Sequence, residues 1–143
     1  MRIYELLRHK GFAVITARPN ATVLEVINLL KEYNLGAVVV SPDGRRVAGI
    51  VTERDIVRTL ADGTEFLNGP VSEIMTADVL TCFAKDSVQS LMEIMTERRI
   101  RHLPVVDDHG RLAGIVSIGD AVKSHITQIE FERDQLEGYV SHS

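Results

Sequence analysis

The stretch that decides the fold is Gly49-Ile50-Val51-Thr52-Glu53-Arg54-Asp55, which recurs as Gly114-Ile115-Val116-Ser117-Ile118-Gly119-Asp120. In each copy a glycine and two β-branched residues end a buried strand, a hydroxyl residue begins a helix, and an aspartate follows three positions later. The first turn of a helix has unpaired N–H groups and the positive end of the dipole, which favours an anion such as phosphate. A hydroxyl can donate to that anion, and an ionised aspartate suits a pair of ribose hydroxyls.

The same residues also fit a capping box, in which the hydroxyl accepts from the amide at N3 and the acid at N3 reaches back to the cap. One such motif alone favours the cap. Repetition changes this balance, because the motif is kept in both copies while neighbouring solvent positions differ between them. The repeat therefore favours a ligand role for the hydroxyl and the aspartate.

The sequence is a tandem repeat. Residues 14–58 align with a second copy 65 positions later without a gap, whereas chance would give about two or three identities. The identical pairs include Val14/Val79, Thr16/Thr81, Val23/Val88, Val40/Val105, Arg46/Arg111 and Val57/Val122. Such a repeat indicates one supersecondary unit used twice.

The elements within one repeat can be predicted from turn signals and periodicity. A short helix over residues 3–10 precedes a strand over residues 12–16, and the capping box Thr22-x-x-Glu25 begins an amphipathic helix that ends near residue 34. Strands over residues 37–40 and 47–51 flank a Ser-Pro-Asp-Gly turn, so they are antiparallel, and a helix over residues 52–61 follows. Each half is thus β-α-β-β-α, an α/β (α+β) fold, and the halves should pack about a pseudo-twofold axis to cover their sheets.

Composition excludes several functions. The chain has 143 residues, 45% of them hydrophobic, a net charge of −4 and one cysteine, Cys82. It cannot form an internal disulfide, and a reducing cytoplasm fits. The net charge argues against nucleic-acid binding, and no apolar run is long enough for a membrane helix. The histidines show no metal-ligand spacing, so no metal is expected.

These residues resemble the tandem CBS (cystathionine-β-synthase) domain pair, also called the Bateman module. The resemblance extends from about residue 12 to residue 126 and also includes Ile74-Met75-Thr76 and the stretch from Arg101 to Asp107. It implies a regulatory module that binds adenosine-containing ligands (AMP, ADP or ATP) in clefts between the two motifs, and that commonly pairs into a disc-shaped homodimer. The predicted division is one module over 1–143, with motif 1 at 12–62, a linker at 63–76, motif 2 at 77–127 and a helical extension at 128–143.

The resemblance also implies two nucleotide sites. The first would join Thr52, Arg54 and Asp55 with Thr81, Arg101, His102 and Pro104. The second would join Ser117 and Asp120 with Thr16, Gly36, Ala37 and Val38. In each site the hydroxyl would contact phosphate and the aspartate would hold the ribose.

The two sites are predicted to differ, because Arg54, Arg101 and His102 can neutralise phosphates at the first site. At the matching positions the second site has Gly119, Gly36 and Ala37, so it is expected to be weak, empty or selective for a less charged ligand. His102 could instead be a hydrogen-bonded structural residue. Arg98 and Arg99 are expected on a solvated helix end.

The last helix is predicted to continue to about residue 139. A mostly apolar set of residues along it falls near a seven-residue repeat: Val122, Ile126, Ile129, Arg133, Leu136 and Val140. Such a narrow seam favours helix pairing, either in a dimer or with a partner protein, although the helix could also lie back along its own domain. The sequence contains no nucleophile–base pair and no carboxylate dyad, so an enzyme is not expected, and no cofactor is required. The alternative function is a ligand-independent structural dimerisation or protein-interaction module.

Overall fold

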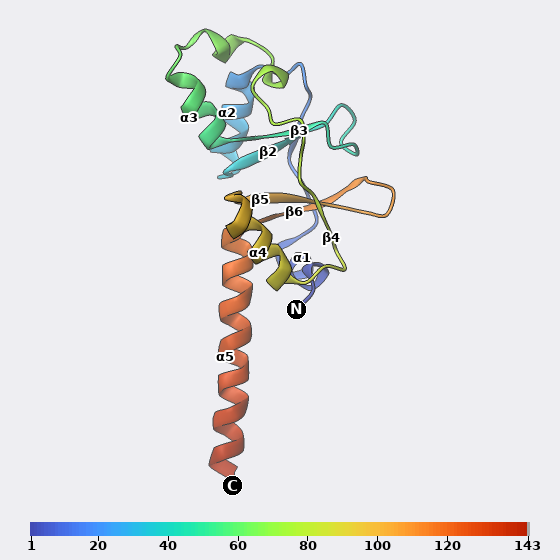
Figure 1. The fold of residues 1–143 in the computed structure, drawn as a ribbon, viewed down its shortest axis with the longest axis vertical. Helices are drawn as coiled ribbons and strands as arrows, with labels where there is room; N and C mark the ends of the chain where they lie inside the picture. Colours follow the sequence, from blue (N-terminus) through green and yellow to red (C-terminus); the bar gives the residue numbers. More distant parts are fainter. Residues whose placement is uncertain (143) are drawn as a thin grey trace.

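The computed structural model describes residues 1–142, with side chains up to Val140, and folds them into two stacked halves and a projecting helix (Figure 1). The first half contains β1 (Thr16–Ala17), α2 (Val23–Glu32), β2 (Ala37–Val40), β3 (Gly49–Thr52) and α3 (Glu53–Leu60). The second contains β4 (Cys82–Phe83), α4 (Val88–Arg98), β5 (His102–Val106), β6 (Leu112–Ser117) and α5 (Ile118–His142). Three short segments precede the repeats: α1 (Ile3–Lys10) and the 3-10 turns η1 (Glu65–Asn68) and η2 (Val71–Glu73).

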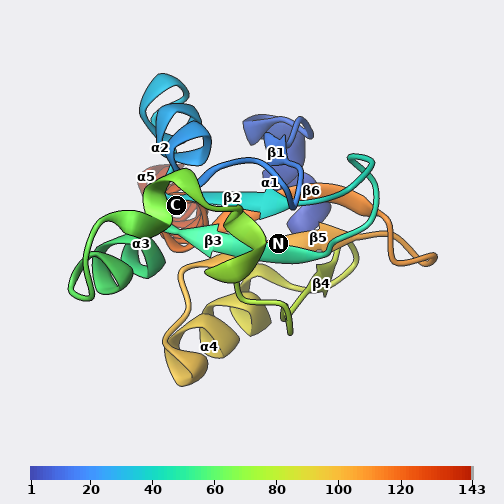
Figure 2. The ribbon, with the colours of Figure 1, turned by 90° about the horizontal axis from the view of Figure 1, so that it is seen from above.

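Both halves have the same sheet, which confirms the predicted α/β class and the β-α-β-β-α repeat about a pseudo-twofold axis. In each, the first strand pairs parallel to the second, and the second pairs antiparallel to the third. Val38 lies opposite Val51 in the first sheet, and Leu103 lies opposite Val116 in the second. Seen from above, β2 and β3 lie over β5 and β6 (Figure 2). The two sheets therefore cover each other, as neither half could do alone.

Two predicted strand boundaries are wrong. The leading strand is limited to Thr16–Ala17 and does not begin at Phe12, whose side chain is 55% exposed. Thr16 and Ala17 pair in parallel with Val39 and Val40 of β2. The described residues before Thr16 do not pair with β2, so the strand does not extend to them. The third strand likewise begins at Gly49 and not at residue 47.

The leading segments cross between the halves. Ile3, Leu6 and Leu7 of α1 are buried in the core of the second half, beside Leu91 and Leu103. Val71 of η2 is buried in the core of the first half, with Ile74 and Met75 packed against it. Each half thus receives apolar side chains from the segment that leads into the other repeat.

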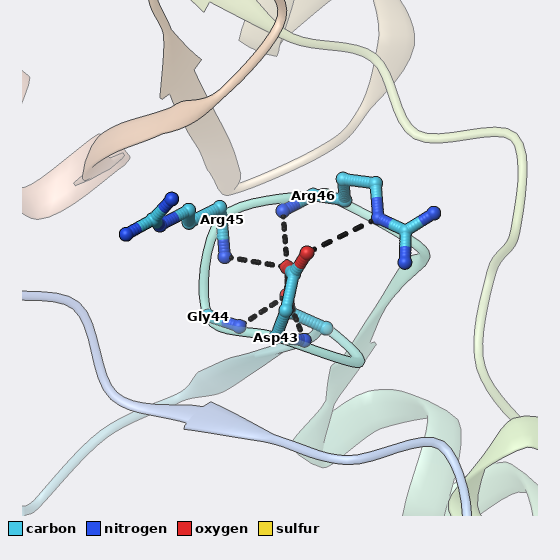
Figure 3. Close-up of polar contacts among 5 residues, drawn as sticks. Asp43, Gly44, Arg45 and Arg46 are labelled. Atoms are coloured by element: carbon cyan, nitrogen blue, oxygen red, sulfur yellow. Dashed lines mark hydrogen bonds and ion pairs between the residues drawn. The ribbon is translucent and has the colours of Figure 1, made fainter.

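The turn between β2 and β3 is held by one carboxylate (Figure 3). Oδ1 of Asp43 accepts from the backbone N–H groups of Arg45 and Arg46, each at 2.9 Å, and Oδ2 accepts from Nε of Arg46 at 3.2 Å. The backbone hydrogen bonds from Arg46 and Arg45 lower the pKa of Asp43 to about 2. The carboxylate is therefore charged at neutral pH and fixes the hairpin that leads into the first repeated motif.

Helix α5 extends well beyond the two halves, toward the bottom of Figure 1. Along it, Ile126, Ile129, Leu136 and Val140 are each at least half exposed. The predicted end near residue 139 is close to the observed one at His142. No helix in the part of the chain that the structure describes combines the length and the apolar composition needed to cross a membrane.

Candidate functional site

A cavity of about 600 Å³ lies between the two halves. Its walls come from the start of α3, from the segment that enters the second half, and from the junction between α4 and β5. The predicted site residues that line it are Thr52, Arg54, Asp55, Arg101 and His102. These five come from both repeats, so the fold brings the two parts of the predicted first site together.

Thr52 and Asp55 form the cap that begins α3. The backbone N–H of Asp55 donates to Oγ1 of Thr52 at 3.2 Å, and the backbone N–H of Thr52 donates to Oδ2 of Asp55 at 2.9 Å. Oγ1 of Thr52 also donates to Oδ2 at 3.1 Å. The two bonds that the carboxylate accepts both use Oδ2, which leaves Oδ1 of Asp55 as an acceptor for a ligand hydroxyl. Capping and ligand binding are therefore compatible in this geometry.

Five arginines line the cavity: Arg54, Arg58, Arg98, Arg99 and Arg101. None of the five forms an ion pair with any residue that the structure describes. Three carboxylates, those of Glu53, Asp55 and Asp78, also line it. The excess of guanidinium groups suits a ligand that carries several negative charges, because arginine binds phosphate oxygens through paired charge-assisted hydrogen bonds.

Arg98 and Arg99 also line the cavity, although they were predicted only as part of a solvated helix end. Both are exposed and lie at the end of α4, as expected, but that end forms a wall of the cavity. Arg99 adopts a left-handed conformation, with φ of 56°, and closes the helix by donating its N–H to the carbonyl of Met95. The sequence contains a signal for this position, because Arg98 and Arg99 come just before Arg101 and His102. Those two residues were predicted to belong to the first site.

His102 lies where the two halves meet. A Cβ atom added to Gly36 would lie 3.1 Å from the His102 ring, so the imidazole packs against the backbone of the first half. Burial lowers the pKa of His102, and the nearby Lys10 ammonium lowers it further. The imidazole is therefore neutral at pH 7 and can offer one donor and one acceptor.

Two residues predicted for the first site do not line the cavity. Thr81 lies next to Leu80, which does line it, and Pro104 is buried in β5 opposite Ile115.

The Sγ atom of Cys82 lies 3.7 Å from the carbonyl oxygen of Pro104, to which it donates. Burial raises the pKa of Cys82 to about 12, so this cysteine is an inert core residue.

The residues of the predicted second site lie outside this cavity, except Gly36, which lines it. Ser117 begins α5 and accepts from the N–H of Asp120 at 3.1 Å, while the N–H of Ser117 donates to Oδ2 of Asp120 at 2.9 Å. Thr16 pairs with Val39 in the sheet, and Ala37 pairs with Thr52. Val38 is buried in β2, and Gly119 lies in the first turn of α5.

In the second motif the aspartate forms an ion pair with a lysine. Nζ of Lys10 lies 2.6 Å from Oδ2 of Asp120 and donates to the carbonyl oxygen of Ile115 at 2.8 Å. Burial alone would raise the pKa of Asp120, but the hydrogen bonds from Lys10 and Ser117 outweigh it and lower that pKa. The carboxylate of Asp120 is therefore charged at neutral pH.

Metal-ligating side chains are not clustered. Over the described residues, no group of three or more His, Cys, Asp and Glu side chains is placed to hold a metal ion.

The structure is thus a tandem module of two β-α-β-β-α repeats about a pseudo-twofold axis. An arginine-lined cavity lies between the repeats, at the start of α3. The chain belongs to the CBS domain family, whose model matches residues 6–62 and 71–126. The resemblance stated from the sequence motifs is thereby confirmed.

Solved structures support the same assignment. The chain is 43% identical to a CBS-domain containing protein from Agrobacterium tumefaciens, with a TM-score of 0.83, covering 87% of this chain and 99% of that one. A CBS domain protein from Pyrobaculum aerophilum, complexed with AMP, is 32% identical with a TM-score of 0.76, over 84% and 89% of the two chains. The CBS domain pair of protein MJ0100, in complex with 5′-methylthioadenosine and S-adenosyl-L-methionine, is 27% identical with a TM-score of 0.78, over 87% and 99%.

Some relatives are enzymes. The chain is 34% identical over 110 residues to an inosine-5′-monophosphate dehydrogenase of Methanocaldococcus jannaschii, but this match spans only 21% of the enzyme's length. The matches to the A. tumefaciens protein and to the MJ0100 domain pair, in contrast, span nearly all of those chains. The similarity is therefore to CBS domains and does not extend over most of the dehydrogenase.

Proposed function

We propose that this chain is a regulatory sensor that binds an adenine nucleotide in the cavity between its two CBS motifs. The observation that supports this most directly is that five arginines lie around Thr52 and Asp55 and form no ion pair with any of the described residues. Arg54, Arg101 and their neighbours would bind the phosphates, with help from the N-terminal N–H groups of α3. Oδ1 of Asp55 would accept from the ribose hydroxyls.

Two solved relatives support an adenosine-type ligand. One of them is complexed with AMP and the other with 5′-methylthioadenosine and S-adenosyl-L-methionine. Because the cavity of this chain is rich in arginine, we propose that it prefers the phosphorylated ligands, AMP, ADP or ATP, to the sulfonium and thioether ones. No cofactor is needed for this role, and we propose that the chain itself catalyses no reaction.

A thermal-unfolding panel with AMP, ADP, ATP, NAD and S-adenosylmethionine tests the proposal. A ligand that binds only the folded state stabilises it by about 2.7 kcal/mol at a hundredfold excess over Kd, which raises the midpoint by several degrees. We expect such a shift with an adenine nucleotide and its loss in Asp55→Ala. Arg101→Gln should weaken binding at least about tenfold, because one charge-assisted contact is removed.

Arg45→Gln is the matched control, because Arg45 is an exposed arginine outside the cavity. It should leave the ligand-induced shift unchanged. If no nucleotide raises the midpoint of the unmodified chain, the sensor proposal fails and the alternative is favoured, a structural dimerisation or protein-interaction module.

The output of such a sensor requires a partner surface. We propose that two copies of the chain pair, that ligand shifts the relative orientation of the two motifs, and that the change is passed to an effector protein. The exposed apolar seam of α5, from Ile126 to Val140, supports pairing with a second helix, because its seven-residue repeat is typical of coiled coils. A location in the cytoplasm stays a prediction.

A further inference from the structure

The ammonium of Lys10 lies at the start of α5, in the second motif. It donates to Oδ2 of Asp120, in the first turn of α5, and to the carbonyl oxygen of Ile115 in β6. A cation at a helix N-terminus opposes the helix dipole, so these two acceptors must hold it there. Side-chain exposures of 34% for Lys10 and 26% for Asp120 place the pair in a partly buried setting, where it is stronger than on an open surface.

The pseudo-twofold symmetry provides an internal comparison. Met75 packs against Gly49 of the first motif, just as Leu7 of α1 packs against Gly114 of the second. The motif aspartates differ, however. Among the described residues, the carboxylate of Asp55 accepts hydrogen bonds only from Thr52, whereas that of Asp120 also accepts one from the ammonium of Lys10.

We propose that Lys10 sets the number of nucleotides bound per chain by occupying the second motif from within. Its ammonium forms an ion pair with Asp120, so a ribose diol meets a carboxylate that is already paired. A nucleotide at the second motif must displace Lys10 and leave the ammonium, the carboxylate and the Ile115 carbonyl to find new partners. The chain therefore binds one nucleotide, in the arginine-lined cavity, and this inference rests on the function proposed above.

The substitution Lys10→Met tests this, because it removes the ammonium that pairs with Asp120 and keeps an unbranched side chain of similar length. Isothermal titration of the full chain with AMP should give one site in the unmodified protein and two in Lys10→Met. Any second binding event in the unmodified protein should be at least about tenfold weaker than the first. Lys10→Arg keeps a cation and should retain one site. Lys31→Met, an exposed lysine of α2, is the control for loss of a charge and should also retain one site.

A second background separates this inference from the proposed function. Asp55→Ala should abolish binding, and Asp55→Ala with Lys10→Met should restore one site, which Asp120→Ala then removes. Two sites of similar affinity in the unmodified chain, or a single site in Lys10→Met, would overturn the role of Lys10 while leaving the first cavity as a nucleotide site. Absence of AMP binding in both the unmodified chain and Lys10→Met would overturn both proposals. The thermal midpoint of each variant without ligand verifies that it is folded.

Discussion

Gly49 shows why a single position of the repeated motif is restricted to glycine. An added Cβ would overlap Sδ of Met75 and would lie 3.0 Å from the backbone carbonyl oxygen of Thr76. That carbonyl accepts from the N–H of Ile50, and the N–H of Thr76 donates back to Ile50, so the backbone there cannot move away freely. Glycine therefore allows the crossing segment to approach β3 closely.

Gly49→Ala should accordingly destabilise the protein by about 1–3 kcal/mol, as overpacking of a tight contact does. Gly138→Ala is the matched substitution, because nothing lies within 4 Å of an added Cβ there and the residue is inside α5. It should stabilise that helix by up to about 1 kcal/mol. Urea denaturation measures both, and an equal effect of the two substitutions would contradict the role assigned to the Gly49 contact.

At the scale of elements, α1 comes directly before the first repeat in the sequence but packs in the core of the second half. Leu7 is 1% exposed and lies in the core of the second half, where it also fills the space beside Gly114. The same packing places Lys10, at the end of α1, next to Asp120. The helix thus stabilises the second core and positions the lysine at the second motif.

Leu7→Ala should destabilise the protein by about 2–5 kcal/mol, because it leaves a cavity in a closed core. Leu24→Ala in α2 is the control, since Leu24 is 46% exposed and its loss should change stability by no more than about 0.5 kcal/mol. Equilibrium unfolding in urea compares the two variants. Similar small losses in both would mean that α1 is not part of the second core in solution.

At the scale of the whole molecule, the part of α5 beyond residue 126 lies outside the family match. The match ends at residue 126, and the helix continues to His142 with its apolar seam exposed. Seam residues spaced by alternate steps of three and four positions lie on one stripe of a helix, where a second helix can cover them. This arrangement fits an interface and not a core.

Removal of residues 128–143 should therefore weaken self-association while leaving nucleotide binding intact, because the cavity lies between the two halves. Analytical ultracentrifugation over a range of concentrations measures the first effect, and titration with nucleotide measures the second. An unchanged dimer after truncation would assign the seam to another protein. Loss of nucleotide binding would show that α5 also supports the cavity.

Local sequence signals were sufficient for most of the elements. The capping residues Thr22, Thr52 and Ser117 marked helix starts that the structure reproduces. These starts could be predicted because caps, periodicity and repeat register depend on a few neighbouring residues or occur twice in the chain. The grouping of Thr52 and Asp55 with Arg101 and His102 came from the family resemblance, and all four line the cavity.

The sequence by itself determined the repeated β-α-β-β-α unit, the antiparallel hairpins and the two motif positions, since each depends on neighbours a few residues apart. Only the tertiary structure decided that the leading segments cross, that Arg98 and Arg99 face the cavity, and that Lys10 pairs with Asp120. Lys10 and Asp120 are 110 positions apart, and neither belongs to a periodic pattern that includes the other. Their contact follows from how α1 packs into a distant core, which no local propensity encodes.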